Sequence, residues 1–171
     1  MRRPRLEEYA RPYRRYIDLV PGVDILAMLE AQKDAVRKLR ALSAEQAGYR
    51  YAKGKWSVRE VVGHLSDNER VFAYRMLCLG RGDTAPLKGF DHDAYVAAAR
   101  FDEKRLSDLV GEFLSVREAT ISLGSSLDSQ ALDRIGTASG AALSPRAAMF
   151  ISAEHVEHHL RILRERYLGF G

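Results

Sequence analysis

Apolar residues recur along the chain at intervals of three, four and seven, the spacing that puts side chains on one face of an α-helix. Four stretches carry this pattern and predict helices over about 24–41, 57–79, 102–127 and 144–168. No stretch alternates apolar and polar residues over several positions, so no sheet is expected. Four amphipathic helices joined by loops predict an all-α fold, an up-and-down four-helix bundle.

The ends of these helices carry residues that favour helix starts and stops. Ser57 and Glu60 match a capping box, in which each side chain bonds the backbone N–H of the other residue. Ser144 followed by Pro145 marks the start of the last helix, because serine caps well and proline suits the first turn. The segments 43–55, 80–100 and 128–143 are expected to be loops with at most a short helical turn. The predicted N-caps are Asp24, Ser57, Asp102 and Ser144.

Length and charge divide the chain into an arm and one domain. With 171 residues there is room for a single compact core. Residues 1–16 hold six arginines against two glutamates, so this segment carries the whole net charge of +4. We therefore predict a basic arm over 1–22, closed by Pro21-Gly22, and a helical domain over 23–171. A charge run is most often a solvated tail lying over a domain, so nucleic acid is not the expected partner.

Composition limits the location of the protein. No stretch approaches the roughly 20 apolar residues that a membrane-spanning helix needs, so no membrane partner is expected. The one cysteine, Cys78, excludes an intrachain disulfide framework. A cytoplasmic location is the resulting expectation.

Three of the five histidines lie close together in the sequence EHVEHHL of the last predicted helix. His155 and His159 are four residues apart, so both imidazoles project from one side of that helix. They share this side with apolar residues, which points them into the bundle. Burying an imidazole costs free energy unless its nitrogens have a partner, and a metal ion is the simplest such partner.

A third ligand is expected from the helix with the strongest apolar pattern, where His64 borders the buried face. Three neutral imidazoles suit Zn²⁺, Ni²⁺, Mn²⁺ or Fe²⁺ and leave coordination positions open for water or substrate. An HxxxH pair is weak evidence by itself, and histidines of an ordinary core are the alternative. His158 is expected at the surface or beside a ligand, and His92 in a loop. The sequence identifies no catalytic acid or base.

Three segments together resemble one protein family: KWSVREVVGHLSDNERVFAYRML, GFDHDAYV and AEHVEHHLRILRERYLG. A tryptophan-led second helix with a histidine, paired with an HxxxHH last helix, is similar to the DinB-like (DinB/YfiT) superfamily of metalloenzymes. The resemblance covers roughly residues 23–169. It implies an up-and-down four-helix bundle and a divalent metal ion held by His64, His155 and His159.

The resemblance also implies a range of activities. Members are described as metal-dependent hydrolases, or as transferases and isomerases that use low-molecular-weight thiols such as bacillithiol or mycothiol. The expected function is therefore a metal-dependent enzyme that activates a bound water or thiol against a small-molecule substrate. The alternative is a non-enzymatic, metal-braced module that binds a ligand or partner, with a link to stress left open. Homodimers are common in the family, and the sequence leaves this state open here.

Overall fold

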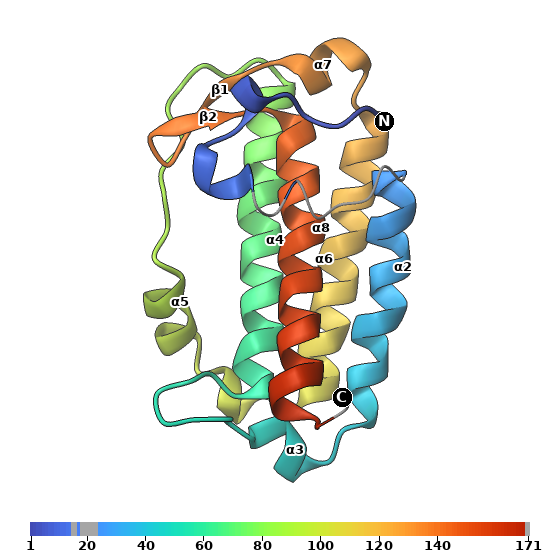
Figure 1. Ribbon diagram of the computed structural model, residues 1–171, viewed down its shortest axis with the longest axis vertical. Helices are drawn as coiled ribbons and strands as arrows, with labels where there is room; N and C mark the ends of the chain where they lie inside the picture. The colour runs from blue at the N-terminus through green and yellow to red at the C-terminus, as the bar shows by residue number, and fades with distance from the viewer. Residues whose placement is uncertain (15–16, 18–23, 170–171) are drawn as a thin grey trace.

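The computed structural model describes residues 1–14, 17 and 24–169 and consists mainly of four long helices (Figure 1). Each agrees closely with a predicted segment, so the four-helix bundle is confirmed. The last helix continues through a π-helical turn, Leu163–Tyr167, and the chain leaves it at Gly169, where φ is +62°. The long helices are α2 (Ile25–Arg37), α4 (Val58–Gly80), α6 (Leu106–Ser126) and α8 (Pro145–Ile162).

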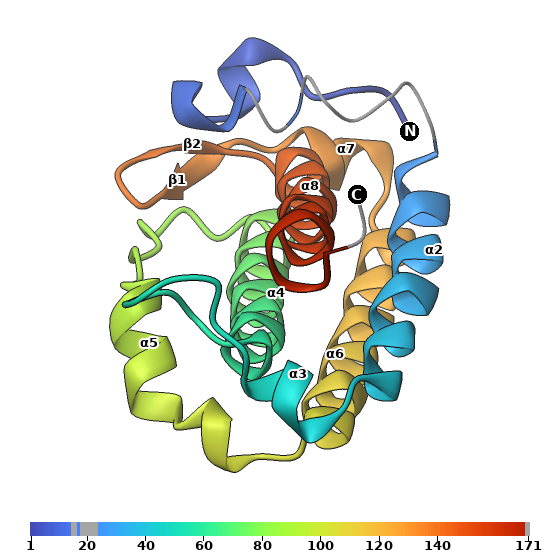
Figure 2. The ribbon, with the colours of Figure 1, turned by 60° about the horizontal axis from the view of Figure 1, so that its bottom comes forward.

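The helices form a ring in which α2 and α4 each pack against both α6 and α8 (Figure 2). The first two long helices, α2 and α4, are therefore diagonal to each other. The structure adds one refinement to the predicted up-and-down bundle. The long connection 81–105 returns the chain to the end at which α4 began, so α4 and α6 run parallel (Figure 1).

Most predicted helix starts are confirmed by hydrogen bonds. The Ser57 hydroxyl accepts from the Glu60 N–H, and the Glu60 carboxylate accepts from the Ser57 N–H. Asp24 and Ser144 cap α2 and α8 by accepting the backbone N–H of Leu26 and of Ala147, respectively. The predicted cap at Asp102 is wrong. Helix α6 begins later, at Leu106, and the Asp102 carboxylate instead accepts hydrogen bonds from Ser57 Oγ and from Arg50.

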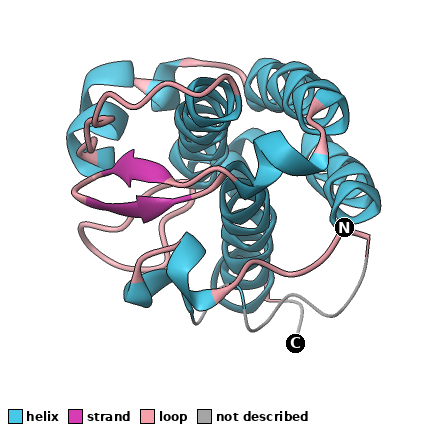
Figure 3. Cartoon of the chain, turned by 90° about the horizontal axis from the view of Figure 1, so that it is seen from above, coloured by secondary structure: helices cyan, strands magenta, loops and turns pink. Residues whose placement is uncertain are grey.

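The connections contain more structure than the sequence predicts. Short helices α3 (Ala44–Gly48), α5 (His92–Ala99) and α7 (Ser129–Asp133) lie in the three expected loops. A two-stranded antiparallel hairpin, β1 (Gly136–Ala138) and β2 (Ala141–Leu143), covers one end of the bundle (Figure 3). The prediction of no sheet was therefore wrong at this point. Strands of three residues are too short to show alternation.

The interior has two apolar clusters with polar residues between them. One cluster includes Leu29 and Phe72, and the other includes Val36 and Leu65. Gln32 and Glu69 lie between these positions on α2 and α4, and both are buried. The core is therefore interrupted by a polar layer partway along the bundle.

The N-terminal segment packs on the hairpin end of the bundle. Tyr9 pairs with Leu143 of β2, and Glu8 accepts a 2.7 Å hydrogen bond from Ser144 Oγ. Both Glu8 and Tyr9 are buried, so a solvated tail does not describe this part of the arm. The predicted closure at Pro21-Gly22 lies outside the described residues. No helix in the described part of the chain is long and apolar enough to cross a membrane.

Candidate metal centre

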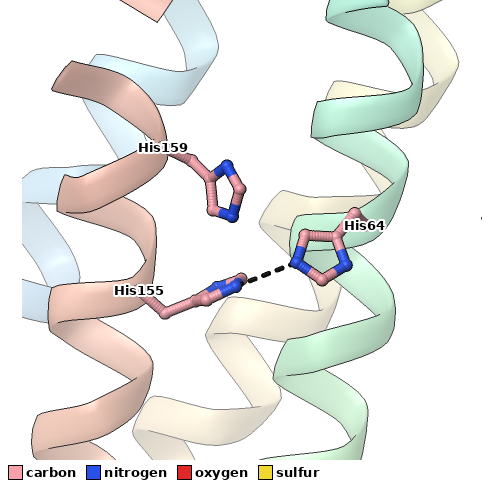
Figure 4. Close-up of side chains that lie close together, drawn as sticks. All are labelled: His64, His155 and His159. Carbon is pink, nitrogen blue, oxygen red and sulfur yellow. Dashed lines mark hydrogen bonds between the residues drawn. The ribbon is translucent and has the colours of Figure 1, made fainter. Parts of the chain in front are cut away.

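The structure brings together the three histidines predicted as metal ligands (Figure 4). His64 projects from the second turn of α4, and His155 and His159 project from successive turns of α8. One ring nitrogen of each residue lies within 4.8 Å of the others. The two Nε2 atoms of His64 and His155 are 2.9 Å apart. Their binding of a metal stays a prediction, but the required convergence is present.

Burial keeps these imidazoles uncharged. Desolvation, with the neighbouring His92 as the next cause, lowers the pKa of His64 to about 4. Desolvation, with His64 as the next cause, lowers the pKa of His159 to about 3. The pKa of His155 lies well below its usual value for the same reasons, burial first and His159 second. At neutral pH each ring therefore keeps a lone pair available for a cation.

The donor set fits a divalent ion of the transition series. Three imidazoles are the ligand type that zinc, nickel and iron share, and the cluster contains no carboxylate or thiolate. The His155 nitrogen that meets His64 is Nε2, and at most one hydrogen bond can join the two Nε2 atoms, whereas Nδ1 of His155 is buried without a hydrogen-bond partner among the described residues. A cation between the three rings is a chemically suitable partner for the converging lone pairs.

The cluster opens onto a cavity of about 380 Å³. Trp56 lies at its rim, with its ring 4.7 Å from that of His64 and stacked at 6.4 Å on that of His159. His92, expected in a loop, is the first residue of α5, and its ring lies 5.7 Å from His64. His158 lines the cavity as well and contacts Arg161. Neither His92 nor His158 belongs to the group of converging nitrogens.

A family model described as the DinB superfamily matches residues 27–163, which is most of the chain. The chain belongs to the DinB superfamily. Among solved structures, YfiT from Bacillus subtilis matches with a TM-score of 0.77 and 19% identity, over 86% of this chain and 87% of YfiT. It is described as a probable metal-dependent hydrolase with an unusual four-helix bundle topology.

A second structural match is a mycothiol-dependent maleylpyruvate isomerase, with a TM-score of 0.68 and 12% identity. The alignment covers 85% of this chain and 61% of the isomerase. No curated protein sequence matches the chain significantly. At these identities the two structures support the shared fold, and their activities are those of the other proteins.

The structure also shows cavity residues that sequence reasoning missed in this DinB domain. Trp56 was not among the predicted site residues, yet its ring lies against that of His64 and is stacked on that of His159. Arg75 lies eleven residues after His64, which is close to three helical turns and hence on the same face. That spacing is the one signal by which the sequence could have shown Arg75 as a cavity residue. Tyr13 and Ser139 reach the cavity from distant segments.

Proposed function

We propose that this protein is a divalent-metal-dependent enzyme whose ion is held by His64, His155 and His159. It acts on a small molecule by activating a water or a thiol at that ion, as a hydrolase or as a low-molecular-weight-thiol transferase. The observation that carries the proposal is a cluster of three uncharged imidazoles opening onto a cavity. The cavity leaves room for water or substrate at an open coordination position of the ion, which distinguishes a catalytic metal site from a structural one.

The structural relatives support the proposal without fixing the reaction. One is described as a probable metal-dependent hydrolase and the other as mycothiol-dependent. Both descriptions fit a site at which an activated water or thiolate attacks a small molecule. The reaction of this chain is therefore proposed as one of these two types.

The residues around the cluster have separate roles in this proposal. A bound divalent ion supplies Lewis acidity, which lowers the pKa of a water or thiol. The three histidines stay uncharged and keep their lone pairs directed to one point. The Trp56 ring lies against His64 and His159 and helps to position their imidazoles. His92 is exposed and next to His64, so it is placed to exchange a proton between the cavity and solvent.

One observation favours the alternative of a non-enzymatic, metal-braced binding module. The described residues that line the cavity include no aspartate or glutamate, so its histidines and Tyr13 are the general acid–base candidates among them. A metal that only braced α4 against α8 would need no such group. Turnover by the metal-loaded protein separates the two functions.

The first experiment measures metal content in protein made without a polyhistidine tag. Wild type should hold about one ion per chain, and His64→Ala, His155→Ala and His159→Ala should each lose it. His158→Ala is the matched control, because His158 neighbours His159 but lies outside the cluster. Metal-loaded and chelated wild type are then assayed with esters, and with electrophiles plus a thiol. Absence of metal, or equal turnover after chelation, would overturn the proposal.

A further inference from the structure

The cavity beside the three histidines has an unusual charge pattern. Among the described residues that line it, and leaving its histidines aside, Arg75 is the only one whose side chain is charged at neutral pH. No aspartate, glutamate or lysine side chain faces the cavity within the described chain. A divalent ion at the histidines would add to the positive charge of Arg75. Such a cavity favours an anionic ligand.

Arg75 is buried, with 3% of its surface exposed, and the groups that contact its guanidinium among the described residues are neutral. Its Nη2 donates to the backbone oxygen of Lys88 at 3.1 Å and to Ser139 Oγ at 2.8 Å. Its guanidinium lies 5.0 Å from the centre of the Phe72 ring, and the Tyr13 side chain also stabilises its charge. No carboxylate of the described residues pairs with it.

The other deeply buried arginines differ in this respect. Arg117 pairs with Glu69, and Arg146 pairs with Glu8 and Asp133. A buried charge without a counter-ion is costly, and burial lowers the pKa of Arg75. Among the described residues, the bundle thus neutralises Arg117 and Arg146 internally and pairs no carboxylate with the arginine of the cavity.

Arg75 and the three histidines line the same cavity. Both His64 and Arg75 lie on the cavity face of α4, separated by about 16 Å along the helix. On α4, Asn68 and Phe72 lie between them, and the cavity wall also includes Phe90 and Ile151. The cavity therefore has a histidine end, a cationic end, and a wall between them that is apolar except for the Asn68 amide.

We infer that Arg75 binds a carboxylate group of the substrate, whose other end reacts at the three-histidine centre. The guanidinium fork matches a carboxylate in shape, and Ser139 and Tyr13 provide hydroxyl groups beside it. A single cation matches a monoanion better than a phosphate dianion. The substrate class is thus a small carboxylic acid with an apolar spacer. The assignment of the reacting end depends on the proposed function, whereas the assignment of the anion subsite depends only on the surroundings of Arg75.

The test compares two series of probes by calorimetry on metal-loaded protein. The first series is ω-mercaptocarboxylic acids of increasing chain length, and the second is the ω-mercaptoalcohols of the same lengths. Wild type should bind the acid at least tenfold more tightly than the matching alcohol at one optimal length. In Arg75→Gln the acid should fall to the affinity of the alcohol, and alcohol binding should stay the same.

The matched control is Arg70→Gln, which removes one positive charge from an exposed position on the same helix. It should leave the preference for acids intact. Arg75→Lys, which keeps the charge but loses the fork, should retain part of it. Ser139→Ala removes a hydrogen-bond partner and tests the subsite should Arg75→Gln fail to fold.

Three results would overturn the inference: equal binding of acid and alcohol by wild type, an equal loss in Arg70→Gln, or an acid preference that persists in Arg75→Gln. The last would mean that the carboxylate binds the metal. Matching phosphonates that bind more tightly than carboxylates would also contradict it. Chelated protein separates the two proposals: an Arg75-dependent preference for hexanoate over hexanol should survive metal removal, even if the metal has no catalytic role.

Discussion

Arg117 Nη2 donates a 2.9 Å hydrogen bond to Glu69 Oε2 in the middle of the bundle, where neither side chain is more than 1% exposed. Arg117 Nη1 also donates to Gln32 Oε1, and Gln32 Nε2 donates to the backbone oxygen of Ala153. This polar layer joins all four long helices. It reaches α8 two residues before His155, so it helps to fix the helix that carries two of the proposed ligands.

Removing one member of the buried pair should destabilise the protein strongly. Glu69→Leu or Arg117→Met leaves an unpaired charge in the core, and each should lower the free energy of unfolding by about 3–5 kcal/mol. The double variant should lose much less than the sum, because it leaves no buried charge. Urea unfolding measures all three values.

The exposed ion pair of Arg70 with Glu112, at 2.8 Å, provides the control. Replacing either of these residues should change the free energy of unfolding by about 1 kcal/mol or less. Additive losses at Glu69 and Arg117 would show that the two side chains do not act as a pair.

The sequence predicts the bundle well because its signals are local. Apolar periodicity locates the long helices, and the capping residues Ser57 and Ser144 mark two starts to within one residue. The sequence also predicts part of the histidine cluster, since the four-residue spacing of His155 and His159 places both side chains on the same side of the helix. Such features depend only on neighbours along one helix.

The features that were missed depend on contacts between distant segments. Asp102 has the chemistry of a cap, but Ser57 and Arg50 bind its carboxylate from elsewhere in the fold. Nothing in the local sequence distinguishes Arg75 from the other arginines, because its contact with Ser139 forms only when the hairpin packs against α4. Trp56 likewise becomes a cavity residue only when α8 places His159 beneath its ring.

A close approach at Gly63 constrains the helix next to His64. A Cβ atom at this position would lie 2.4 Å from Cγ and Cδ1 of the buried Phe101 ring. Gly63→Ala should therefore destabilise the protein by about 1–3 kcal/mol through overpacking, despite the better helix propensity of alanine.

Gly111→Ala in α6 is the matched control, because its Cβ would meet only the end of the Arg40 side chain at 3.3 Å. That variant should gain about 0.5–1 kcal/mol. Thermal unfolding of both variants measures the difference. A stabilised Gly63→Ala would show that the Phe101 ring moves aside without cost.

The stability of the metal-free protein should depend on the three buried histidines. Their pKa values are lower in the folded than in the unfolded state, so on acidification the unfolded chain takes up protons first. Stability is then full above about pH 6.5 and falls as the pH drops towards 4. For His64 alone, a pKa lowered from 6.5 to about 4 corresponds to about 3 kcal/mol.

Urea midpoints of chelated protein between pH 4 and 7.5 test this dependence. The urea midpoint of His64→Gln should change less steeply with pH than that of wild type, because the variant lacks one of the groups that must stay uncharged in the folded state. Equal slopes in the two proteins would contradict burial as the cause of the lowered pKa of His64.

Trp56 should report metal binding directly, because it is the only tryptophan of the chain and its ring lies 4.7 Å from that of His64. Open-shell ions such as Cu²⁺, Ni²⁺ and Co²⁺ quench indole fluorescence over a few ångströms. Their addition to metal-free protein should quench Trp56 with saturation at one ion per chain. Zn²⁺, with its filled d shell, should bind without comparable quenching and should block later quenching by Ni²⁺.

The variants place the quenching ion within the site. His64→Gln and His155→Gln should lose saturable quenching, whereas His158→Gln should keep it. Quenching that survives in His64→Gln and His155→Gln but disappears in a variant lacking His92 and His158 would move the ion to the rim of the cavity. The pair of His155 and His159 would then be explained by core packing, and the metal ligands would have to be sought around α5.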